Sequence, residues 1–174
     1  QKPLWGVSHV LGHVYANFIT TQSPSLAYSL PARAPQFPLL ALVVSGKHCH
    51  IALFTDHFTY KVLGYTHDDA IGEAFDKVAK MTGLPYPGGP SVAKRAELGD
   101  PFAFDLPKPR MEHVYDTSFS GLKTAVLRKA QFLCGHDYTL PSTQLPSLLS
   151  EKDISDIAAV FQRVAVEMIV EKAV

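Results

Sequence analysis

The sequence carries no excess of charge of either sign, because its 16 Lys and Arg residues balance its 16 Asp and Glu residues. A neutral chain of this kind gives no electrostatic indication of a nucleic-acid partner. The chain also has only two cysteines, Cys49 and Cys134, which excludes a zinc ribbon. A reduced, intracellular protein is therefore a simpler interpretation than a disulfide framework.

Long apolar runs are missing as well. The run from Leu39 to Val44 falls far short of the ~20 residues that a membrane helix needs, so we expect no membrane partner. The first residues, Gln1 to Trp5, contain neither the apolar segment nor the cleavage site of a signal peptide. A first residue of Gln rather than Met agrees with a segment cut from a longer protein.

The residues that are present are enough for a real core. Hydrophobic residues make up 47% of the 174 positions, which suits one domain of ordinary size. Apolar residues at four-residue spacing predict a helix over residues 9–20. Prolines break any regular element in residues 21–38, where we place a connector and a lobe boundary. Three strands are predicted over residues 39–44, 50–54 and 59–63, and the turns between them favour a meander.

The rest of the chain is predicted to be mainly helical. A carboxylate at Asp68 or Asp69 suits the positive end of a helix that runs to about Thr82, with Gly83 in the usual position beyond the helix end. A short helix over residues 92–98 follows it.

Two further helices are predicted towards the end of the chain. One spans residues 119–132, and its start at Ser118 to Gly121 would either bind an anion or cap the helix, of which we favour capping. Residues 134–149 are expected to form a polar excursion that contains prolines. Ser150 and Asp153 then form a capping box that opens a last helix with an apolar stripe facing the core.

His9 and His13 are the clearest candidates for chemistry. Residues four positions apart lie one above the other on a helix, so both imidazoles can reach one ion, and neutral nitrogen donors suit zinc or iron. A complete site needs at least one further ligand. Spacing alone leaves coincidence as the more common explanation for such a pair. The other histidines show no mutual spacing that argues for a site.

Three further features have both an ordinary and a functional interpretation. The turn after the first strand, Ser45 to Lys47, is either a plain hairpin turn or a set of backbone N–H groups that hold a phosphate. Asp76 lies on the polar face of its helix, where a solvated, salt-bridged surface is the common outcome. Gly88 and Gly89, between prolines, are either a plain turn or a place where the backbone approaches a ligand.

Six stretches with unusual residue choices occur in a fixed order along the chain. They are Ser8–Val14, Leu42–His48, Asp68–Lys77, Tyr86–Pro90, Asp116–Lys123 and Asp156–Gln162. In this order and at these separations they resemble the bacterial-type tRNA threonylcarbamoyladenosine transferase family, once described as glycoproteases. Members are about twice as long, so the resemblance implies an internal fragment, without the N-terminal nucleotide-binding segment or the C-terminal segment that supplies another metal ligand.

The resemblance implies a fold and its division. The family has a two-lobed α/β architecture, actin-like and sugar-kinase-like, with nucleotide bound in the cleft between the lobes. Only the middle part would be present here. Residues 1–38, with the metal-binding helix and the connector, would end the first lobe, and residues 39–174 would begin the second.

The resemblance also implies an activity. The parent protein would be a metal-dependent acyltransferase that moves a threonylcarbamoyl group from threonylcarbamoyl-adenylate to the adenosine 3′ of the anticodon, in tRNAs that read codons beginning with A. Accessory proteins of the bacterial complex would be its partners, and its location would be cytoplasmic, or mitochondrial in a eukaryote. The isolated fragment is expected to be inactive.

Family roles carry over to particular residues. His9 and His13 would hold one divalent metal ion, iron or zinc, and no residue here stands out as a general base. Asp76 would hold ribose hydroxyls and Gly89 would contact the nucleotide. The substrate-binding turn would consist of Val43, Val44, Ser45, Gly46 and Lys47.

Two departures from the family pattern affect these expectations. Leu11 stands where family members commonly have an acidic residue, and Lys47 stands where they have a second glycine. Lys47 either weakens the phosphate contact or meets the phosphate with its ammonium group. A non-catalytic scaffold paralogue is therefore the alternative function. A metallopeptidase is disfavoured, because Val10 rather than a catalytic Glu follows His9.

Overall fold

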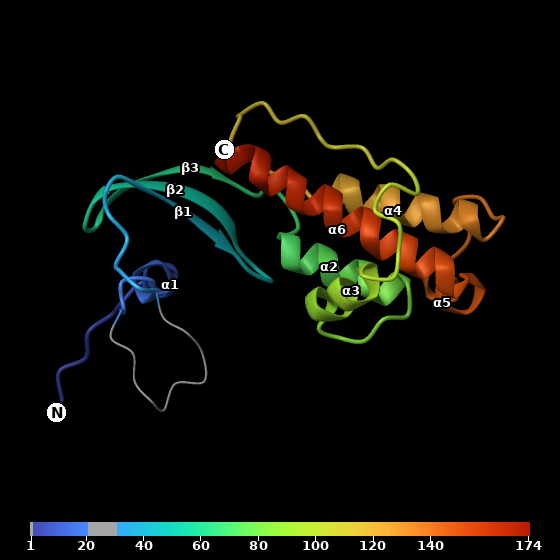
Figure 1. Ribbon diagram of the computed structural model, residues 1–174, viewed down its shortest axis with the longest axis horizontal. Coiled ribbons are helices and arrows are strands. Elements are labelled where there is room, and N and C mark those ends of the chain that lie inside the picture. Colours follow the sequence, from blue (N-terminus) through green and yellow to red (C-terminus); the bar gives the residue numbers. More distant parts are fainter. Residues whose placement is uncertain (1, 21–30) are drawn as a thin grey trace.

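The computed structural model describes residues 2–20 and 31–174 of the chain. Within these residues it contains one three-stranded sheet and six α-helices, so the fold is mixed α/β. The sheet and helix α1 form one half of the molecule and the other helices form the second half, as Figure 1 shows. The division into lobes at residue 38 stays a prediction, and residues 21–30 of the predicted connector lie outside the described residues.

The sheet is the meander that the sequence predicts. Strands β1 (Leu39–Val44), β2 (Cys49–Asp56) and β3 (Thr59–Tyr65) are antiparallel neighbours in the order β1-β2-β3. Val43 pairs with His50 across β1 and β2. The second and third strands are longer than predicted, because pairing between them continues to Asp56 opposite Thr59 and to His50 opposite Tyr65.

Helix α1 (His9–Ala16) packs against one face of this sheet. Its buried residue Val14 joins Ala41, Ala52 and Phe54 in a small apolar cluster, because alternate residues of a strand point to the same face. The helix is shorter than the predicted 9–20. The Asn17 side chain donates to the carbonyl oxygens of His13 and Val14, which satisfies free carbonyl groups at the helix end and terminates the helix there.

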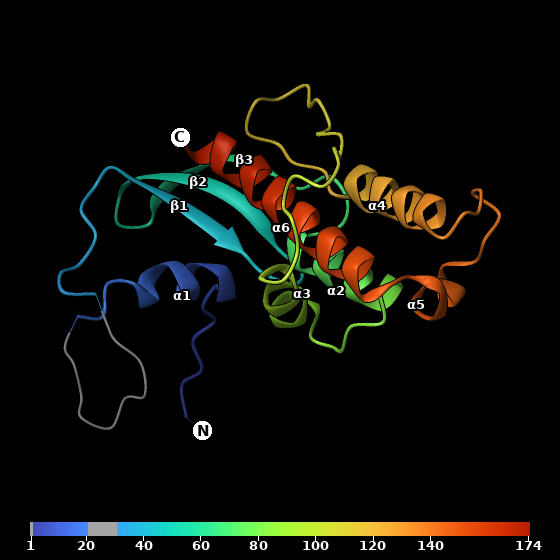
Figure 2. The same cartoon turned by 45° about the vertical axis from the view of Figure 1, so that its right-hand side comes forward.

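The helical half is built around the long helix α6 (Glu151–Ala173). Helices α2 (Ile71–Met81) and α3 (Gly88–Ala96) pack against each other, and α3 and α4 (Ser120–Leu133) each pack against α6. Figure 2 shows α6 lying between α4 and the pair α2 and α3. The apolar stripe predicted for the last helix is buried in this core, with Ile157, Phe161 and Val164 at 0–1% exposure.

The helix ends confirm some predictions and correct others. Ser150 and Asp153 form the predicted capping box of α6, and Gly83 follows α2 with a φ of +72°. The predicted capping of α2 by Asp68 or Asp69 is wrong, because the residue before α2 is Ala70 and no side chain caps it. Both carboxylates instead bond to other partners, as described below.

Two further boundaries differ from the prediction. Helix α3 begins at Gly88 rather than at residue 92, so the two glycines start a helix and do not form a separate turn. The segment 134–149 is not a purely polar excursion. It contains a 3₁₀ turn (Ser142–Gln144) and the short helix α5 (Leu145–Leu148), and Leu145 is fully buried in the core.

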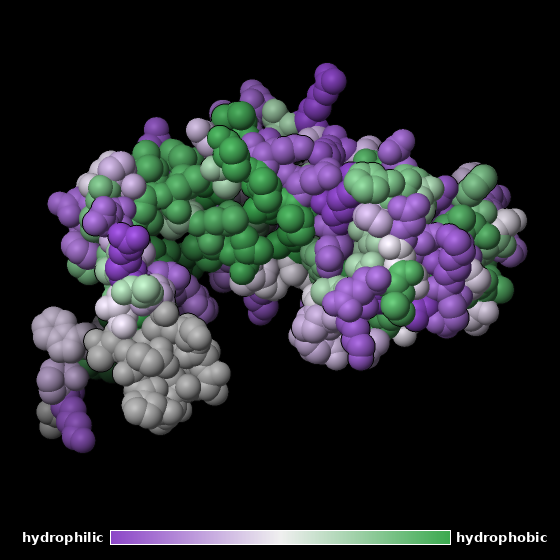
Figure 3. Space-filling model, in the orientation of Figure 1, coloured by the Kyte–Doolittle hydropathy of each residue, from purple (hydrophilic) through white to green (hydrophobic). Residues whose placement is uncertain are grey.

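The structure also bears on what composition predicted about the cysteines and about long apolar segments. Cys49 and Cys134 are both free, in agreement with the expected reduced state. Apolar side chains gather over the sheet in Figure 3, and on β1 the exposed ones are Leu40, Leu42 and Val44. Among the described residues, no helix combines the length and the apolar character needed to cross a bilayer.

Candidate functional site

The turn between β1 and β2 is closed by the side chain of its first residue. Ser45 Oγ accepts hydrogen bonds from the backbone N–H groups of Lys47 (3.3 Å) and His48 (3.0 Å), and Ser45 N donates to the His48 carbonyl at 2.8 Å. Two of the N–H groups expected to hold an anion are therefore used inside the turn. The Lys47 side chain stays exposed and can reach an anion through its ammonium group.

This turn lies directly on the first turn of α2. Gly72 N donates to the Ser45 carbonyl at 3.3 Å. A Cβ atom at Gly72 would lie 2.7 Å from the Cα of Gly46, so glycine is required for this close approach. The contact places the end of β1 beside the start of α2, the helix that carries Asp76. At this strand end, Val43 is half-buried towards α1 and Val44 is exposed.

Asp76 joins α2 to the start of α3. Its Oδ1 accepts a hydrogen bond of 2.7 Å from the backbone N–H of Gly88, one of the free donors at the helix start. A carboxylate at this end also interacts favourably with the helix dipole. Within the described residues, Oδ2 of Asp76 has no hydrogen-bond partner, so this oxygen can accept a bond from a ligand.

The two glycines at the start of α3 differ in their surroundings. A Cβ at Gly88 would lie 2.5 Å from both the Cα of Asp76 and the carbonyl oxygen of Phe75, whereas a Cβ at Gly89 would meet nothing within 4 Å. Gly88 is therefore needed for helix packing, and Gly89 faces open space. A depression of about 430 Å³ adjoins Asp76. Its lining residues are Glu73, Asp76, Lys77, Ala79, Lys80, Leu84 and Tyr86.

The two histidines of α1 converge as their spacing predicts. His9 Nε2 and His13 Nε2 lie 2.8 Å apart, and the ring centroids are separated by 4.6 Å. Two nitrogen ligands of one zinc ion at bond angles of 90–109° lie roughly 3.0–3.4 Å apart, given a Zn–N distance of about 2.1 Å. The observed 2.8 Å is slightly shorter than this range and corresponds to a hydrogen bond between the two rings, so a small rotation of the rings would be needed for both to bind one divalent ion. Within residues 2–20 and 31–174, no group of three or more His, Cys, Asp or Glu side chains is placed to hold a metal.

The His pair is close to the turn described above. The His9 ring lies 6.4 Å from the ring of His48, centroid to centroid, with the two planes nearly perpendicular. His48 follows the turn at the start of β2, and its ring lies 5.7 Å from that of His50. Sequence reasoning found no spacing that singles out His48, because the approach of α1 to the sheet is a tertiary contact.

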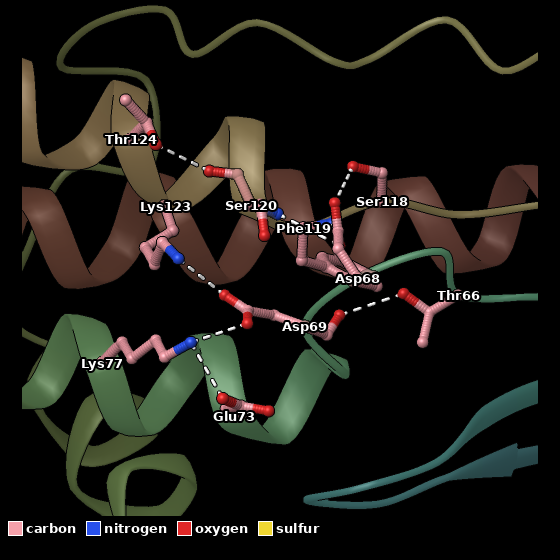
Figure 4. Close-up of polar contacts among 10 residues, drawn as sticks. All are labelled: Thr66, Asp68, Asp69, Glu73, Lys77, Ser118, Phe119, Ser120, Lys123 and Thr124. Atoms are coloured by element: carbon pink, nitrogen blue, oxygen red, sulfur yellow. Dashed lines mark hydrogen bonds and ion pairs between the residues drawn. The ribbon is translucent and has the colours of Figure 1, made fainter.

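A network of charged residues holds α4 to α2, and Figure 4 shows its contacts. Asp68 accepts hydrogen bonds from the backbone N–H groups of Phe119 (2.8 Å) and Ser120 (3.3 Å) and from the hydroxyl of Ser118 (2.5 Å). Asp68 therefore caps α4 rather than α2. No side chain of the segment Ser118 to Gly121 caps α4, so the favoured prediction that this segment caps its own helix is wrong. The N–H groups at the start of α4 are bonded by the carboxylate of a distant residue, Asp68.

Asp69 bridges two helices in the same network. It lies 2.6 Å from Lys77 of α2 and 2.8 Å from Lys123 of α4, and Lys77 also pairs with Glu73 at 2.8 Å. Burial disfavours ionisation of Asp69. The hydrogen bonds and charges of the two lysines outweigh this effect and hold the pKa of Asp69 below its usual value. The same carboxylates raise the pKa of Lys77.

The loops before α2 and α4 are joined in a second place. Thr66 and Thr117 form a parallel β-bridge, and the buried Asp116 accepts a bond from Tyr65 N and lies 2.5 Å from His67 Nε2. These interactions lower the pKa of Asp116, the contact with His67 most of all. These contacts attach the end of β3 to the loop before α4 and so connect the sheet to the helical half.

Comparison with known proteins identifies the family of the chain. The family model described as tRNA N6-adenosine threonylcarbamoyltransferase matches residues 1–174. The chain belongs to this family.

Named relatives of the tRNA N6-adenosine threonylcarbamoyltransferase family support the assignment. A protein of that name from Gloeobacter violaceus is 46% identical over 98% of this chain, and one from Symbiobacterium thermophilum is 46% identical over the whole chain. A third, from Thermomicrobium roseum, is 42% identical over 99% of it. The chain covers 43%, 44% and 48% of these three proteins, so it spans less than half the length of the curated relatives it matches.

The family's motif segments that lie far apart in the sequence come together in this structure. The turn from Ser45 to Lys47 rests on α2, Asp76 contacts the start of α3 beside Gly89, and His9 lies near His48. The roles of these residues in binding metal or nucleotide stay predictions. The residues that hold the segments together are Gly72, Gly88, Asp68 and Asp69. The sequence drew attention to Asp68 and Asp69 by their position before a helix and to Gly88 by its place between prolines, but not to Gly72 as an individual residue.

Proposed function

We propose that the full-length protein carrying this chain transfers the threonylcarbamoyl group of threonylcarbamoyl-adenylate to the adenosine 3′ of the anticodon, in tRNAs that read codons beginning with A. The two-lobed actin-like fold, with the lobe boundary near residue 38, is part of the proposal. So are a cytoplasmic location, or a mitochondrial one in a eukaryote, and the accessory proteins of the bacterial complex as partners. The isolated chain is proposed to be inactive.

The observation that carries the proposal is the clustering of family motif residues around α2. The turn at Ser45 and Gly46 packs on Gly72, and Asp76 binds the start of α3 four residues further along the same helix. A phosphate near the turn and a ribose near Asp76 would lie on the same helix. An acyl-adenylate has these two groups next to each other.

Individual side chains have simple tasks in this reaction. The free oxygen of Asp76 accepts hydrogen bonds from ribose hydroxyls, a role that suits a carboxylate. Gly89, with open space in front of it, allows the nucleoside to approach the backbone. The exposed ammonium group of Lys47 meets the phosphate in place of the N–H groups that Ser45 occupies.

His9 and His13 are proposed to hold one divalent ion, iron or zinc, because their Nε2 atoms converge at 2.8 Å. The ion supplies a Lewis acid that polarises the acyl carbonyl. The task of the cleft residues is to align the accepting amine with that carbonyl.

The experiment is threonylcarbamoyl transfer to tRNA by the full-length protein, supplied with threonylcarbamoyl-adenylate and its partner proteins. We expect product with the wild type and at least a hundredfold loss with His9→Ala, with His136→Ala as the control for loss of an exposed imidazole. Absence of transfer by a folded, metal-loaded wild type would instead support the scaffold paralogue. Peptide hydrolysis would support the metallopeptidase alternative.

A further inference from the structure

Tyr86 is an exposed aromatic residue in the loop between α2 and α3. It is 83% exposed. Within residues 2–20 and 31–174, no other aromatic ring packs against its ring, and its hydroxyl group has no hydrogen-bond partner. The core of the molecule therefore does not depend on this ring, and a task in binding can be tested without disturbing the fold.

The backbone next to Tyr86 is fixed beside Asp76. The loop turns back from the end of α2, and α3 begins against the middle of that helix (Figure 2). Gly88 N donates to Asp76 Oδ1 at 2.7 Å, and a Cβ atom at Gly88 would lie 2.5 Å from the Cα of Asp76. Tyr86 is only two residues before this contact, so the fold keeps its ring near the carboxylate of Asp76.

Tyr86 and Asp76 line the same depression of about 430 Å³. Ala79 and Leu84 add apolar surface to its lining, and Oδ2 of Asp76 is the oxygen that the bond to Gly88 leaves free. Ligand sites of about 300–1,000 Å³ are mostly apolar and contain a few placed polar groups. A nucleoside has matching parts, since its base presents flat apolar faces and its ribose presents hydroxyl groups.

We propose that Tyr86 stacks on the adenine base of threonylcarbamoyl-adenylate while Asp76 binds the ribose of the same nucleotide. This inference rests on the nucleotide site of the proposed function. The base is attached directly to the ribose, so a ribose held by Asp76 brings its base to the other residues of the depression. Aromatic side chains bind bases by stacking on their faces. The accepting adenosine of the tRNA carries the same base, and the experiment separates these two sources of adenine.

The test measures binding to the full-length protein without any activity assay. Affinity for a non-reactive adenylate analogue is determined by calorimetry. We expect Tyr86→Ala to weaken it roughly 5- to 100-fold, the effect of losing one aromatic stack on a base. Tyr86→Phe keeps the ring and should bind within about twofold of the wild type. An analogue that carries fluorescent 2-aminopurine in place of adenine should be quenched less by Tyr86→Ala than by Tyr86→Phe.

Matched controls separate stacking from general effects. Tyr138→Ala removes another exposed tyrosine, which is 72% exposed, and should bind the analogue within about twofold of the wild type. Ribose 5-phosphate lacks the base, so Tyr86→Ala and the wild type should bind it equally. The thermal midpoint of Tyr86→Ala should match the wild type, because its ring packs against no other aromatic ring of the described residues.

The outcomes distinguish two failures. Unchanged affinity for the analogue in Tyr86→Ala, with a loss in Asp76→Ala, would overturn the role of Tyr86 alone. An equal loss for ribose 5-phosphate would also overturn it, and so would weaker tRNA binding with unchanged binding of the analogue. If neither Tyr86→Ala nor Asp76→Ala weakens binding of the analogue, the nucleotide site of the proposed function itself is refuted.

Discussion

Gly88 and Gly89 offer a direct test of how the site is built. They are adjacent residues in the first turn of α3, and an alanine at either position gains the same favourable helix propensity, up to about 1 kcal/mol relative to glycine. Their surroundings differ completely. The Cβ of Gly88→Ala would lie 2.5 Å from backbone atoms of Phe75 and Asp76, while the Cβ of Gly89→Ala would lie in open space.

The magnitude follows from these distances. Ordinary contacts of a Cβ begin at 3.4 Å, so the start of α3 would have to move away from α2 by about 1 Å. Forcing extra atoms into a packed interface costs about 1–3 kcal/mol. The hydrogen bond from Gly88 N to the Asp76 carboxylate would lengthen, and a bond to a charged group contributes about 1.5–3 kcal/mol. We expect Gly88→Ala to lower the free energy of unfolding by about 1–3 kcal/mol after the gain in propensity.

The assay compares both variants of the full-length protein in urea unfolding and in binding of a non-reactive adenylate analogue. Gly88→Ala should reduce stability and also weaken binding, since it displaces Asp76 from the start of α3. Gly89→Ala should keep the stability of the wild type, or exceed it slightly, yet weaken binding, because its methyl group occupies the space proposed for the nucleoside.

A clear result would refute this reasoning. Equal stability of Gly88→Ala and Gly89→Ala would mean that α3 does not approach α2 as closely as described. Wild-type binding by Gly89→Ala would remove Gly89 from the nucleotide site while leaving the packing argument in place.

Three further predictions concern charge and metal. Asp68→Ala should lower the free energy of unfolding by about 1–2 kcal/mol, because α4 loses its cap, and thermal unfolding should show no such loss for the exposed control Asp105→Ala. The pKa of Asp69 is lower in the folded protein than in the unfolded one. The ionised carboxylate therefore stabilises the folded protein at pH values above the unfolded pKa, and this stability is lost as the pH falls below about 5. Urea titrations at several pH values should therefore show a weaker acid dependence for Asp69→Asn, and an unchanged dependence would contradict the bridge to its two lysines. His13→Ala should abolish stoichiometric zinc retention after dialysis, measured by elemental analysis, whereas full retention would exclude the α1 site.

Much of the local structure could be predicted from the sequence. The bounds of β1, the meander, the capping box at Ser150 and the glycine after α2 all depend on residues close together in the chain. The end of α1 was predicted four residues too late, because periodicity continued beyond Asn17 while the Asn17 side chain already satisfied the helix carbonyl groups. The start of α3 was also misplaced, because its first N–H group is bonded by Asp76, twelve residues earlier.

The sequence by itself determined the order of the elements, the family and the residue types available for chemistry, since motif order, periodicity and spacing are properties of the chain. The tertiary structure alone decided which distant residues meet. Asp68 caps α4, Asp69 joins two helices, Gly72 admits the turn and His48 faces His9. These contacts arise when the sheet and the helices pack together, and no spacing within one segment of the chain encodes them.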